Sequence, residues 1–316
     1  MKAIVCRSYG PPEALRLEDV AIPAAGPNEV LIRVRAASVN QIDKLIRGRP
    51  YVTRAMTGWA RPKDARVGCD LAGEVEAVGR DVTRFRAGDQ VFGTGRGAFA
   101  EYATVSEDRL AVKPPGVTFE EAASTPVAAI TALQALRDRA SLRPGQEILI
   151  NGAAGGVGTF AVQLARMFGA RVTAVCSSGN TGLVESLGAA AVVDYSKADF
   201  TRLPPKFDVV LDCVGNRSLR ACCRVLHPSG TYLAVGTPSL THLLAVKMAS
   251  PLVRQKVVVF MARIRSEDLR MLADLLRSRA IVPVVGDRFS LGDTPAAIRR
   301  LETGHARGKL VIEIDV

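Results

Sequence analysis

Long hydrophobic runs are missing from this sequence of 316 residues. Its apolar side chains occur in short runs such as Ile148–Ile150 and Val257–Phe260, well below the roughly 18 to 20 residues that span a bilayer. The N-terminal segment Met1–Arg7 lacks the apolar core of a signal peptide, because its apolar stretch ends at Arg7. We therefore expect no transmembrane helix, no membrane partner and a cytoplasmic location.

Cysteine and histidine patterns that hold metals or disulfides are also missing. The chain has six cysteines and three histidines, and its cysteines form no CxxC pair. The histidines are separated along the chain from the first four cysteines. Reduced, mostly buried thiols are therefore a better interpretation than a disulfide framework or a cysteine-based metal site.

Acidic residues are fewer than basic ones, 31 against 42, which gives a net charge of +11. Such an excess attracts polyanions or anionic cofactors. Most of the basic residues are arginines dispersed along the chain, so a nucleic-acid partner is not expected from them. With 48% hydrophobic and 23% charged residues, the composition excludes disordered and fibrous proteins and is sufficient for two packed cores.

The chain divides into two types of pattern. Up to about residue 115, short strand-like runs are interrupted by proline and glycine at close intervals, which predicts an irregular β-rich unit. From Thr118 helices and strands alternate, beginning with a helix at 118–139 in which Thr118 and Glu121 have capping-box spacing. The later apolar runs predict parallel strands at 146–151, 171–176, 190–194, 207–213, 229–236 and 256–263.

Helices are expected between these strands and after the last of them. They fall near 156–169, 180–188, 217–226 and 266–279. The order predicts an α/β fold with a doubly wound, parallel, six-stranded Rossmann sheet. We expect a first domain at 1–117 that is completed by 284–316, and a dinucleotide-binding domain at 118–283.

A glycine-rich turn follows the first of these strands. Residues Ala153–Gly158 match the dinucleotide fingerprint GxGxxG, with alanine in the first glycine position, and they lie between a strand and a helix. Backbone N–H groups at the start of that helix would bind a pyrophosphate. The predicted contacts are Ala154, Gly155, Gly156 and Val157.

The end of the second strand bears on the choice of cofactor. About 20 residues past the glycine-rich turn, NAD enzymes carry an acid that binds the ribose hydroxyls. Here the sequence is Cys176-Ser177-Ser178-Gly179-Asn180, without a carboxylate. We therefore predict NADPH rather than NADH, with Ser177, Ser178 and Asn180 donating to the 2′-phosphate. The alternative is that the serines form a local turn or cap the next helix.

Several motifs, in order, resemble one known family. They are Ala37–Asp43, Gly68–Val75, Gly97–Tyr102, the glycine-rich turn, Leu187–Ala189 and Gly304–Lys309. Together they resemble the zinc-independent quinone oxidoreductases, related to zeta-crystallin, of the medium-chain dehydrogenase/reductase superfamily. The resemblance implies a GroES-like N-terminal domain, a Rossmann domain and a cleft between them that holds the nicotinamide. It also implies hydride transfer to a quinone or an α,β-unsaturated carbonyl.

The same resemblance argues against zinc. Zinc-dependent members have a histidine ligand in a Gly-His-Glu motif, where this sequence has Gly68-Cys69-Asp70, and a cysteine ligand where this sequence has the Asn40–Asp43 region. One cysteine and one aspartate do not make the three-ligand site of a catalytic zinc. We predict no metal, and therefore acceptors that are already electron-poor through conjugation.

Catalytic candidates come from one segment of the first domain. By resemblance, Asn40 lies near the nicotinamide and would orient its ribose or donate to the substrate oxygen. Asp43 and Tyr51 lie in the same segment, and Tyr51 would donate to a developing oxyanion. For each of them an ordinary loop role is the alternative. Cys69 is given no catalytic role.

Further cofactor contacts are expected in the second half of the chain. By resemblance, Thr131 lies near the nicotinamide or its phosphates, and Tyr195 lies beside the adenosine phosphate. Open α/β sheets bind ligands at the carboxyl ends of their strands, which adds turn residues there. Lys309 would reach the cofactor or cap the returning strand. The turn residues are Gly215, Asn216, Gly236 and Thr237.

The sequence leaves two alternative functions open, and the resemblance implies a state of assembly. An enoyl-thioester reductase would have the same fold with a larger groove, and a cofactor-binding protein with an RNA-binding role would lose RNA steeply with salt. The resemblance also implies a homodimer, formed by edge pairing of the strand at Lys256–Arg263.

Overall fold

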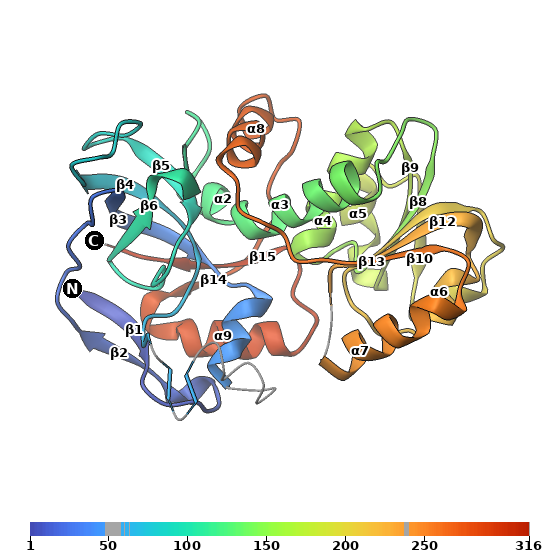
Figure 1. Cartoon of the computed structure of the whole chain (residues 1–316), viewed down its shortest axis with the longest axis horizontal. Helices are drawn as coiled ribbons and strands as arrows, with labels where there is room; N and C mark the ends of the chain where they lie inside the picture. The colour runs from blue at the N-terminus through green and yellow to red at the C-terminus, as the bar shows by residue number, and fades with distance from the viewer. Residues whose placement is uncertain (48–57, 60, 63, 237–239, 316) are drawn as a thin grey trace. The chain divides into compact units, whose positions relative to one another are not determined.

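The computed structural model describes residues 1–47, 58–59, 61–62, 64–236 and 240–315, and it divides into two compact units. The first consists of Met1–Ile130 and Ile264–Val316, and the second of Thr131–Arg263 (Figure 1). Residues 118–130 and 264–283, which were predicted to belong to the dinucleotide-binding domain, are grouped with the first unit in this division. One reason is that helix α8 (Ser266–Arg277) packs against strand β7 (Leu110–Val112).

The first unit is built on a seven-stranded sheet. Its strand order is β14-β15-β3-β4-β5-β7, with β6 paired to β3. In β3 every second side chain is buried, as expected for a strand with one face toward a core. The bounds are β3 Glu29–Ser38, β4 Asp70–Val78, β5 Gln90–Thr94, β6 Tyr102–Ser106, β14 Val285–Ser290 and β15 Lys309–Glu313.

A two-stranded sheet and short helices complete this unit. Strands β1 and β2 pair antiparallel, and helix α9 packs against β14 and β15. The return of the chain to the first unit through β14 and β15 agrees with the expectation for residues after 284. The bounds are β1 Lys2–Cys6, η1 Pro12–Ala14, β2 Leu15–Asp19, η2 Gln41–Arg47, η4 Glu107–Arg109, η9 Leu291–Asp293 and α9 Thr294–Glu302.

The prediction of one continuous helix at 118–139 is wrong, because the structure has separate helices there. The predicted capping box is present, since Thr118 Oγ1 accepts from the Glu121 N–H at 3.2 Å, but helix α2 ends at Ala123. Pro126 has no N–H to continue the helix, so it starts a new one, α3 (Pro126–Gln134). A π-helical turn, η5 (Ala135–Arg139), follows. Helix α2 spans Phe119–Ala123.

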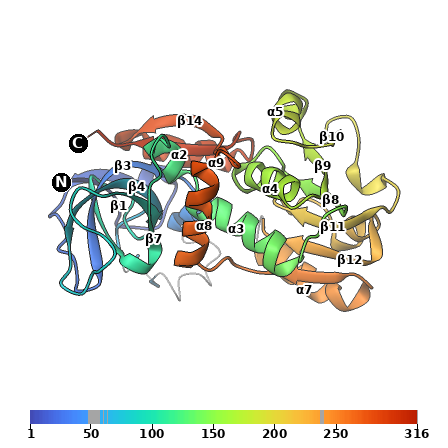
Figure 2. The same cartoon turned by 90° about the horizontal axis from the view of Figure 1, so that it is seen from above.

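The second unit contains the predicted six-stranded parallel sheet. Its strand order is β10-β9-β8-β11-β12-β13, and Figure 2 shows the first five labels in this succession. The order reverses between β8 and β11, which is the switch point where α/β sheets bind ligands. The bounds are β8 Glu147–Asn151, β9 Arg171–Cys176, β10 Ala191–Asp194, β11 Phe207–Asp212, β12 Leu226–Ala234 and β13 Lys256–Val259.

The helices of this unit are shorter than predicted, and one was missed. Helix α7 (Leu240–Ala249) lies between β12 and β13, where the sequence analysis expected none. Its apolar residues are not confined to one face, so it lacks the periodicity that reveals a helix. The remaining bounds are α4 Gly156–Met167, η6 Ser178–Asn180, α5 Thr181–Ser186, η7 Phe200–Arg202, α6 Leu219–Cys223 and η8 Ser250–Leu252.

No helix in the described part of the chain is both long enough and apolar enough to cross a membrane.

Candidate active site

A buried lysine joins three strand ends in the first unit. Lys309 begins β15, Asp70 begins β4, and Asn40 follows the end of β3. Lys309 Nζ donates to Asn40 Oδ1 at 2.6 Å and to the Val39 carbonyl oxygen at 3.0 Å, and it lies 3.8 Å from Asp70 Oδ2. Lys309 is 4% exposed and Asp70 is 0% exposed. The ammonium group is therefore paired and hydrogen-bonded within the protein interior.

The contact with Lys309 fixes the orientation of the Asn40 side chain. Because Oδ1 accepts from the ammonium group, Nδ2 is the donor on the other side of the amide. Nδ2 donates to Asp70 Oδ2 at 2.9 Å, to the Ser38 carbonyl oxygen at 3.2 Å and to Cys69 Sγ at 3.4 Å. Both polar atoms of the Asn40 amide are thus hydrogen-bonded within the protein. A direct contact of Asn40 with a substrate stays a prediction.

Asp43, the second catalytic candidate, belongs to the same cluster. Its Oδ2 accepts from the Asn40 backbone N–H at 2.7 Å, and its side chain is buried. Tyr51, the third candidate, lies outside the described residues. We call Lys309, Asn40, Asp43, Asp70 and Cys69 the Lys309 cluster.

Burial governs the protonation of the Lys309 cluster. Desolvation raises the pKa of Asp43 to about 7, although the Asn40 N–H and the Lys309 charge oppose it. Desolvation likewise raises the pKa of Asp70 to about 6, against the opposing charge of Lys309. The pKa of Lys309 is lowered by burial, and that of the Cys69 thiol is raised well above its usual value. Burial therefore favours the neutral forms of Asp43, Asp70, Lys309 and Cys69.

These residues do not fit a zinc ion. Cys69 and Asp70 are ligand types that zinc accepts, but a buried ammonium group already lies beside Asp70 and would repel a second cation. The thiol must ionise to bind zinc, and burial disfavours its ionised form. The described residues also include no group of three or more histidine, cysteine or acidic side chains placed to hold a metal. No step of the chemistry below is assigned to a metal.

The glycine-rich turn of the second unit has the shape of a phosphate cradle. Gly152 has a φ of +82°, and a Cβ on Gly158 would lie 2.1 Å from the Gly152 carbonyl oxygen. The N-cap of α4 is Gly155, which has no side chain to accept the first N–H groups of the helix. Ala154 lies in the turn, and Gly156 and Val157 begin α4. That this turn binds the pyrophosphate of a dinucleotide stays a prediction.

A buried carboxylate ties the strand ends at the switch point. Asp212 ends β11, and its Oδ1 accepts from Asn151 Nδ2 at 2.9 Å and from the N–H groups of Val214 at 3.0 Å and Gly215 at 2.8 Å. Its Oδ2 accepts from the Tyr232 hydroxyl at 2.7 Å. We call Asp212, Asn151, Tyr232 and Gly215 the Asp212 cluster. It holds the ends of β8, β11 and β12 in fixed relation.

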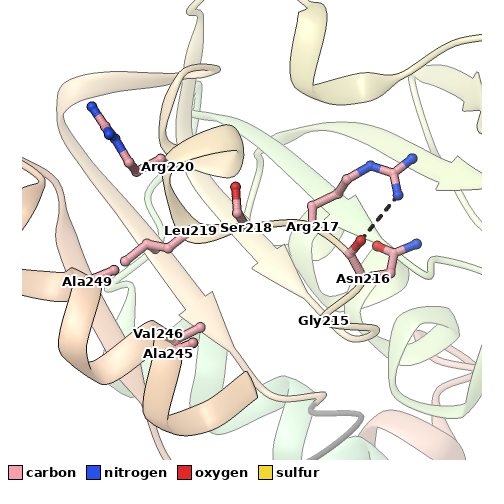
Figure 3. Close-up of a pocket in the computed structure, with 9 residues that line it drawn as sticks. All are labelled: Gly215, Asn216, Arg217, Ser218, Leu219, Arg220, Ala245, Val246 and Ala249. Carbon is pink, nitrogen blue, oxygen red and sulfur yellow. Dashed lines mark hydrogen bonds between the residues drawn. The ribbon is translucent and has the colours of Figure 1, made fainter. Parts of the chain in front are cut away.

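The turn beyond Asp212 opens onto a cavity of about 510 Å³ (Figure 3). Asn216 Oδ1 accepts from Asn151 Nδ2 at 3.1 Å, which connects this turn to the Asp212 cluster. Arg217 donates to the Asn216 carbonyl oxygen at 3.2 Å, the bond drawn in Figure 3. The apolar side of the cavity comes from α6 and α7. Its lining is Gly215, Asn216, Arg217, Ser218, Leu219, Arg220, Ala245, Val246 and Ala249.

The other predicted cofactor residues lie at separate places in the structure. Gly236 follows β12, and a Cβ there would lie 2.0 Å from the Cys213 carbonyl oxygen, so the turn requires glycine. Thr131 lies in α3 and is half-buried, and Tyr195 follows β10 and is 44% exposed. Thr237 lies outside the described residues.

The predicted ribose site contains a carboxylate that its own sequence segment lacks. Asn180 Nδ2 donates to Ser177 Oγ at 3.0 Å, so these two side chains are adjacent. Ser178 Oγ, however, donates to Asp194 Oδ2 and lies 3.2 Å from Ser196 Oγ. Asp194 comes from the neighbouring strand β10, and its Cα pairs in register with Cys176. No acidic residue directly follows β9 in the sequence, but the carboxylate of Asp194 reaches the end of this strand from β10.

Comparison with known proteins places the chain in a family. Residues 26–115 match the alcohol dehydrogenase GroES-like domain, and residues 187–312 match the zinc-binding dehydrogenase domain. A chloroplastic quinone-oxidoreductase of Triphysaria versicolor is 34% identical, over 99% of this chain and 98% of that protein. The chain belongs to the quinone-oxidoreductase-like medium-chain dehydrogenase/reductase family.

Similarity to two further proteins supports this family assignment. The 2-methylene-furan-3-one reductase of Solanum lycopersicum is 35% identical, over 99% of this chain and 79% of that protein. The solved structure of the quinone oxidoreductase from Coxiella burnetii has a TM-score of 0.89 and 32% identity, and it covers 100% of this chain and 99% of that one. As a family member, the protein is an NAD(P)H-type oxidoreductase, and the predicted fold class is confirmed.

Three acids of the two units were not selected as site residues from the sequence. Asp194 and Asp212 each end an apolar strand, and Asp70 begins one. An acid at the end of a buried strand is a usable signal, because burial of a carboxylate requires donors nearby. Some of their donors are close in sequence, but those from other strands, such as Asn40 for Asp70, Tyr232 for Asp212 and Ser178 for Asp194, come together only through the strand pairing.

Proposed function

We propose that the protein is a metal-independent reductase that transfers hydride from NADPH to a quinone or an α,β-unsaturated carbonyl compound. The observation that carries the proposal is the Lys309 cluster. Its ammonium group lies beside Asn40 and Asp70, in the two segments where zinc-dependent relatives carry metal ligands. A cation supplied by the protein itself thus lies in contact with both of these segments.

The chemistry of the acceptor follows from this arrangement. Without a Lewis acid to polarise it, an isolated ketone is a poor hydride acceptor. A quinone or an enone spreads the incoming charge by conjugation, so the protein needs to position the acceptor and to stabilise one oxygen. Two relatives support this class, since one is named a quinone-oxidoreductase and the other a 2-methylene-furan-3-one reductase. The proton that completes the reduction comes from solvent.

The second unit supplies the cofactor site in this proposal. A bound nicotinamide cofactor supplies the hydride. The turn at Gly152–Gly158 holds its pyrophosphate, and the Asp212 cluster keeps Gly215 and Asn216 fixed at the switch point. Ser177 and Asn180 provide donors for a 2′-phosphate, which supports NADPH as the preferred form.

We also propose a homodimer and keep the cytoplasm as the expected location. β13 is the last strand of the six-stranded sheet, and Val259 at its end is 40% exposed. Pairing with β13 of a second copy would remove this edge from solvent. Size-exclusion chromatography with light scattering tests this assembly, and a monomer at micromolar concentration would contradict it.

The decisive experiment measures NADPH oxidation by the purified protein in the presence of a metal chelator. The acceptor panel contains a quinone, a short-chain enone, a simple ketone and an enoyl thioester, with NADH in parallel. Turnover of the quinone or the enone, unchanged by the chelator, is the expected result. Turnover of the simple ketone alone would overturn the proposed acceptor class, and turnover of the thioester alone would favour an enoyl-thioester reductase.

A further inference from the structure

The carboxylate of Asp194 lies at the strand end where the cofactor ribose is expected. In dinucleotide-binding sheets, an acid about 20 residues after the glycine-rich turn accepts from the ribose hydroxyls. That position falls at the end of β9, where this chain has Ser177 and Ser178. β10 pairs with β9, and Asp194 is in register with Cys176. The neighbouring strand therefore delivers to this site the carboxylate that the β9 segment lacks.

The contacts of Asp194 keep it charged and directed toward the serines. Oδ2 accepts from Ser178 Oγ, and Oδ1 accepts from the Ser196 N–H at 3.0 Å and from Ser196 Oγ at 2.7 Å. These hydrogen bonds, that from Ser178 foremost, lower the pKa of Asp194 to about 2. The carboxylate is thus ionised at every pH at which a reductase would be assayed.

One cation lies beside this carboxylate. Lys197 Nζ is 3.5 Å from Asp194 Oδ2, and the Lys197 side chain is 76% exposed. An exposed ion pair of this kind is weak, so the lysine is able to turn toward another anion. Asp194 and Lys197 therefore act on a bound phosphate with opposite signs.

We infer that Asp194 limits the preference of this enzyme for NADPH and allows it to use NADH. The inference rests on the proposed nicotinamide-dependent function. A free ribose 2′-hydroxyl donates a hydrogen bond to a carboxylate, whereas a 2′-phosphate, with nearly two negative charges, is repelled by it. Ser178 does not relieve this repulsion, because its hydroxyl proton is directed to Asp194. The positive charge of Lys197 offsets this repulsion and allows the phosphate to bind.

Three variants test this role with the full-length protein. Asp194→Asn removes the charge and keeps an oxygen that accepts from Ser178. Lys197→Met removes the opposing charge with little change of side-chain length. Asp208→Asn is the matched control, because it makes the same change of net charge near the amino end of β11, whereas Asp194 lies at the carboxyl end of β10 in the same parallel sheet. For each variant, the dissociation constants of NADPH and NADH are measured by quenching of protein fluorescence, and kcat/KM is measured with both cofactors.

The expected changes in the NADPH to NADH affinity ratio have opposite signs. Asp194→Asn raises the ratio about tenfold, Lys197→Met lowers it by several-fold, and Asp208→Asn leaves it unchanged. A purely structural role of this turn would weaken both cofactors together and leave the ratio unchanged. An unchanged ratio in Asp194→Asn, with both cofactors still bound, would overturn this inference alone. Binding of neither cofactor by the unaltered protein would overturn the proposed function as well.

Discussion

The two units each bury a carboxylate cluster, and the two clusters are balanced in different ways. In the second unit, Asp212 is surrounded by neutral donors, namely an amide, a phenol and two backbone N–H groups. In the first unit, Asp70 is paired with the ammonium group of Lys309 and receives a hydrogen bond from Asn40. Both carboxylates are 0% exposed.

The difference separates a structural task from a chemical one. Neutral donors satisfy the Asp212 oxygens and join three strand ends at the switch point, without any other charge. The Lys309 cluster brings two acids and a base together out of water, so that the pKa values of Asp43 and Asp70 lie at about 7 and about 6. The Asp212 cluster is a fixed support, and the Lys309 cluster is expected to respond to pH near neutrality.

The largest effect is expected where the neutral cluster loses its acceptor. Asp212→Ala leaves the Tyr232 hydroxyl, the Asn151 amide and two N–H groups without their carboxylate, and it lowers the free energy of unfolding by about 4 kcal/mol. Tyr232→Phe, which removes one donor, costs about 1 kcal/mol. Denaturant unfolding followed by circular dichroism measures both. Equal, small losses would show that Asp212 does not organise the strand ends.

The charged cluster is tested by removing its base. Lys309→Met leaves two buried acids without a counter-charge, and it lowers the free energy of unfolding by about 3 kcal/mol and abolishes reductase activity. Lys113→Met is the matched control: this buried lysine donates to the carbonyl oxygens of Val117 and Pro114, so that its loss costs about 1 kcal/mol. Full activity of Lys309→Met would contradict the role assigned to the cluster.

A third test concerns the glycine-rich turn of the second unit. In Gly158→Ala the new Cβ meets the Gly152 carbonyl oxygen at 2.1 Å, so the turn must shift, at a cost of about 2 kcal/mol in cofactor affinity. Gly182→Ala in α5 meets no atom within 4 Å and serves as the control. Titration with NADPH measures both affinities. Unaltered affinity in Gly158→Ala would remove the phosphate cradle from the account.

The smallest effect is a dependence of stability on pH. Between pH 3.8 and about 7 the folded state keeps a proton on Asp43 that the unfolded state has lost, so stability falls as pH rises through this range. Between pH 6 and pH 8 the titration of Asp43 lowers the free energy of unfolding by about 1 kcal/mol, and Asp43→Asn removes this decrease. Thermal unfolding of the two proteins across this range should give a flatter profile for the variant. Parallel profiles would show that Asp43 titrates normally.

The sequence was a good guide where local patterns determine structure. Six apolar runs predicted the parallel strands of the second unit, because a buried parallel strand appears as a continuous hydrophobic segment. The helix predicted at 118–139 was broken by Pro126, a signal that was present in the sequence. Helix α7 was missed because it has no apolar periodicity.

The candidate sites depended on contacts that local patterns do not contain. Asn40, Asp43 and Lys309 were each selected in advance, but the contact of Lys309 with Asn40 was not predicted. The two residues are more than 250 positions apart and meet through the pairing of β15 with β3. Asp194 reaches the end of β9 because β10 lies beside it. A prediction based on single segments therefore missed a carboxylate beside Ser178, where the ribose is expected.

The most direct test of the central claim follows hydride transfer in protein stripped of metal. The protein is dialysed against a chelator, its metal content is measured, and NADPH deuterated at C4 is mixed with an enone or a quinone. We expect unchanged turnover, with deuterium transferred from one face of the nicotinamide ring, and loss of turnover in Lys309→Met. Turnover that disappears on metal removal and returns with added zinc would contradict it.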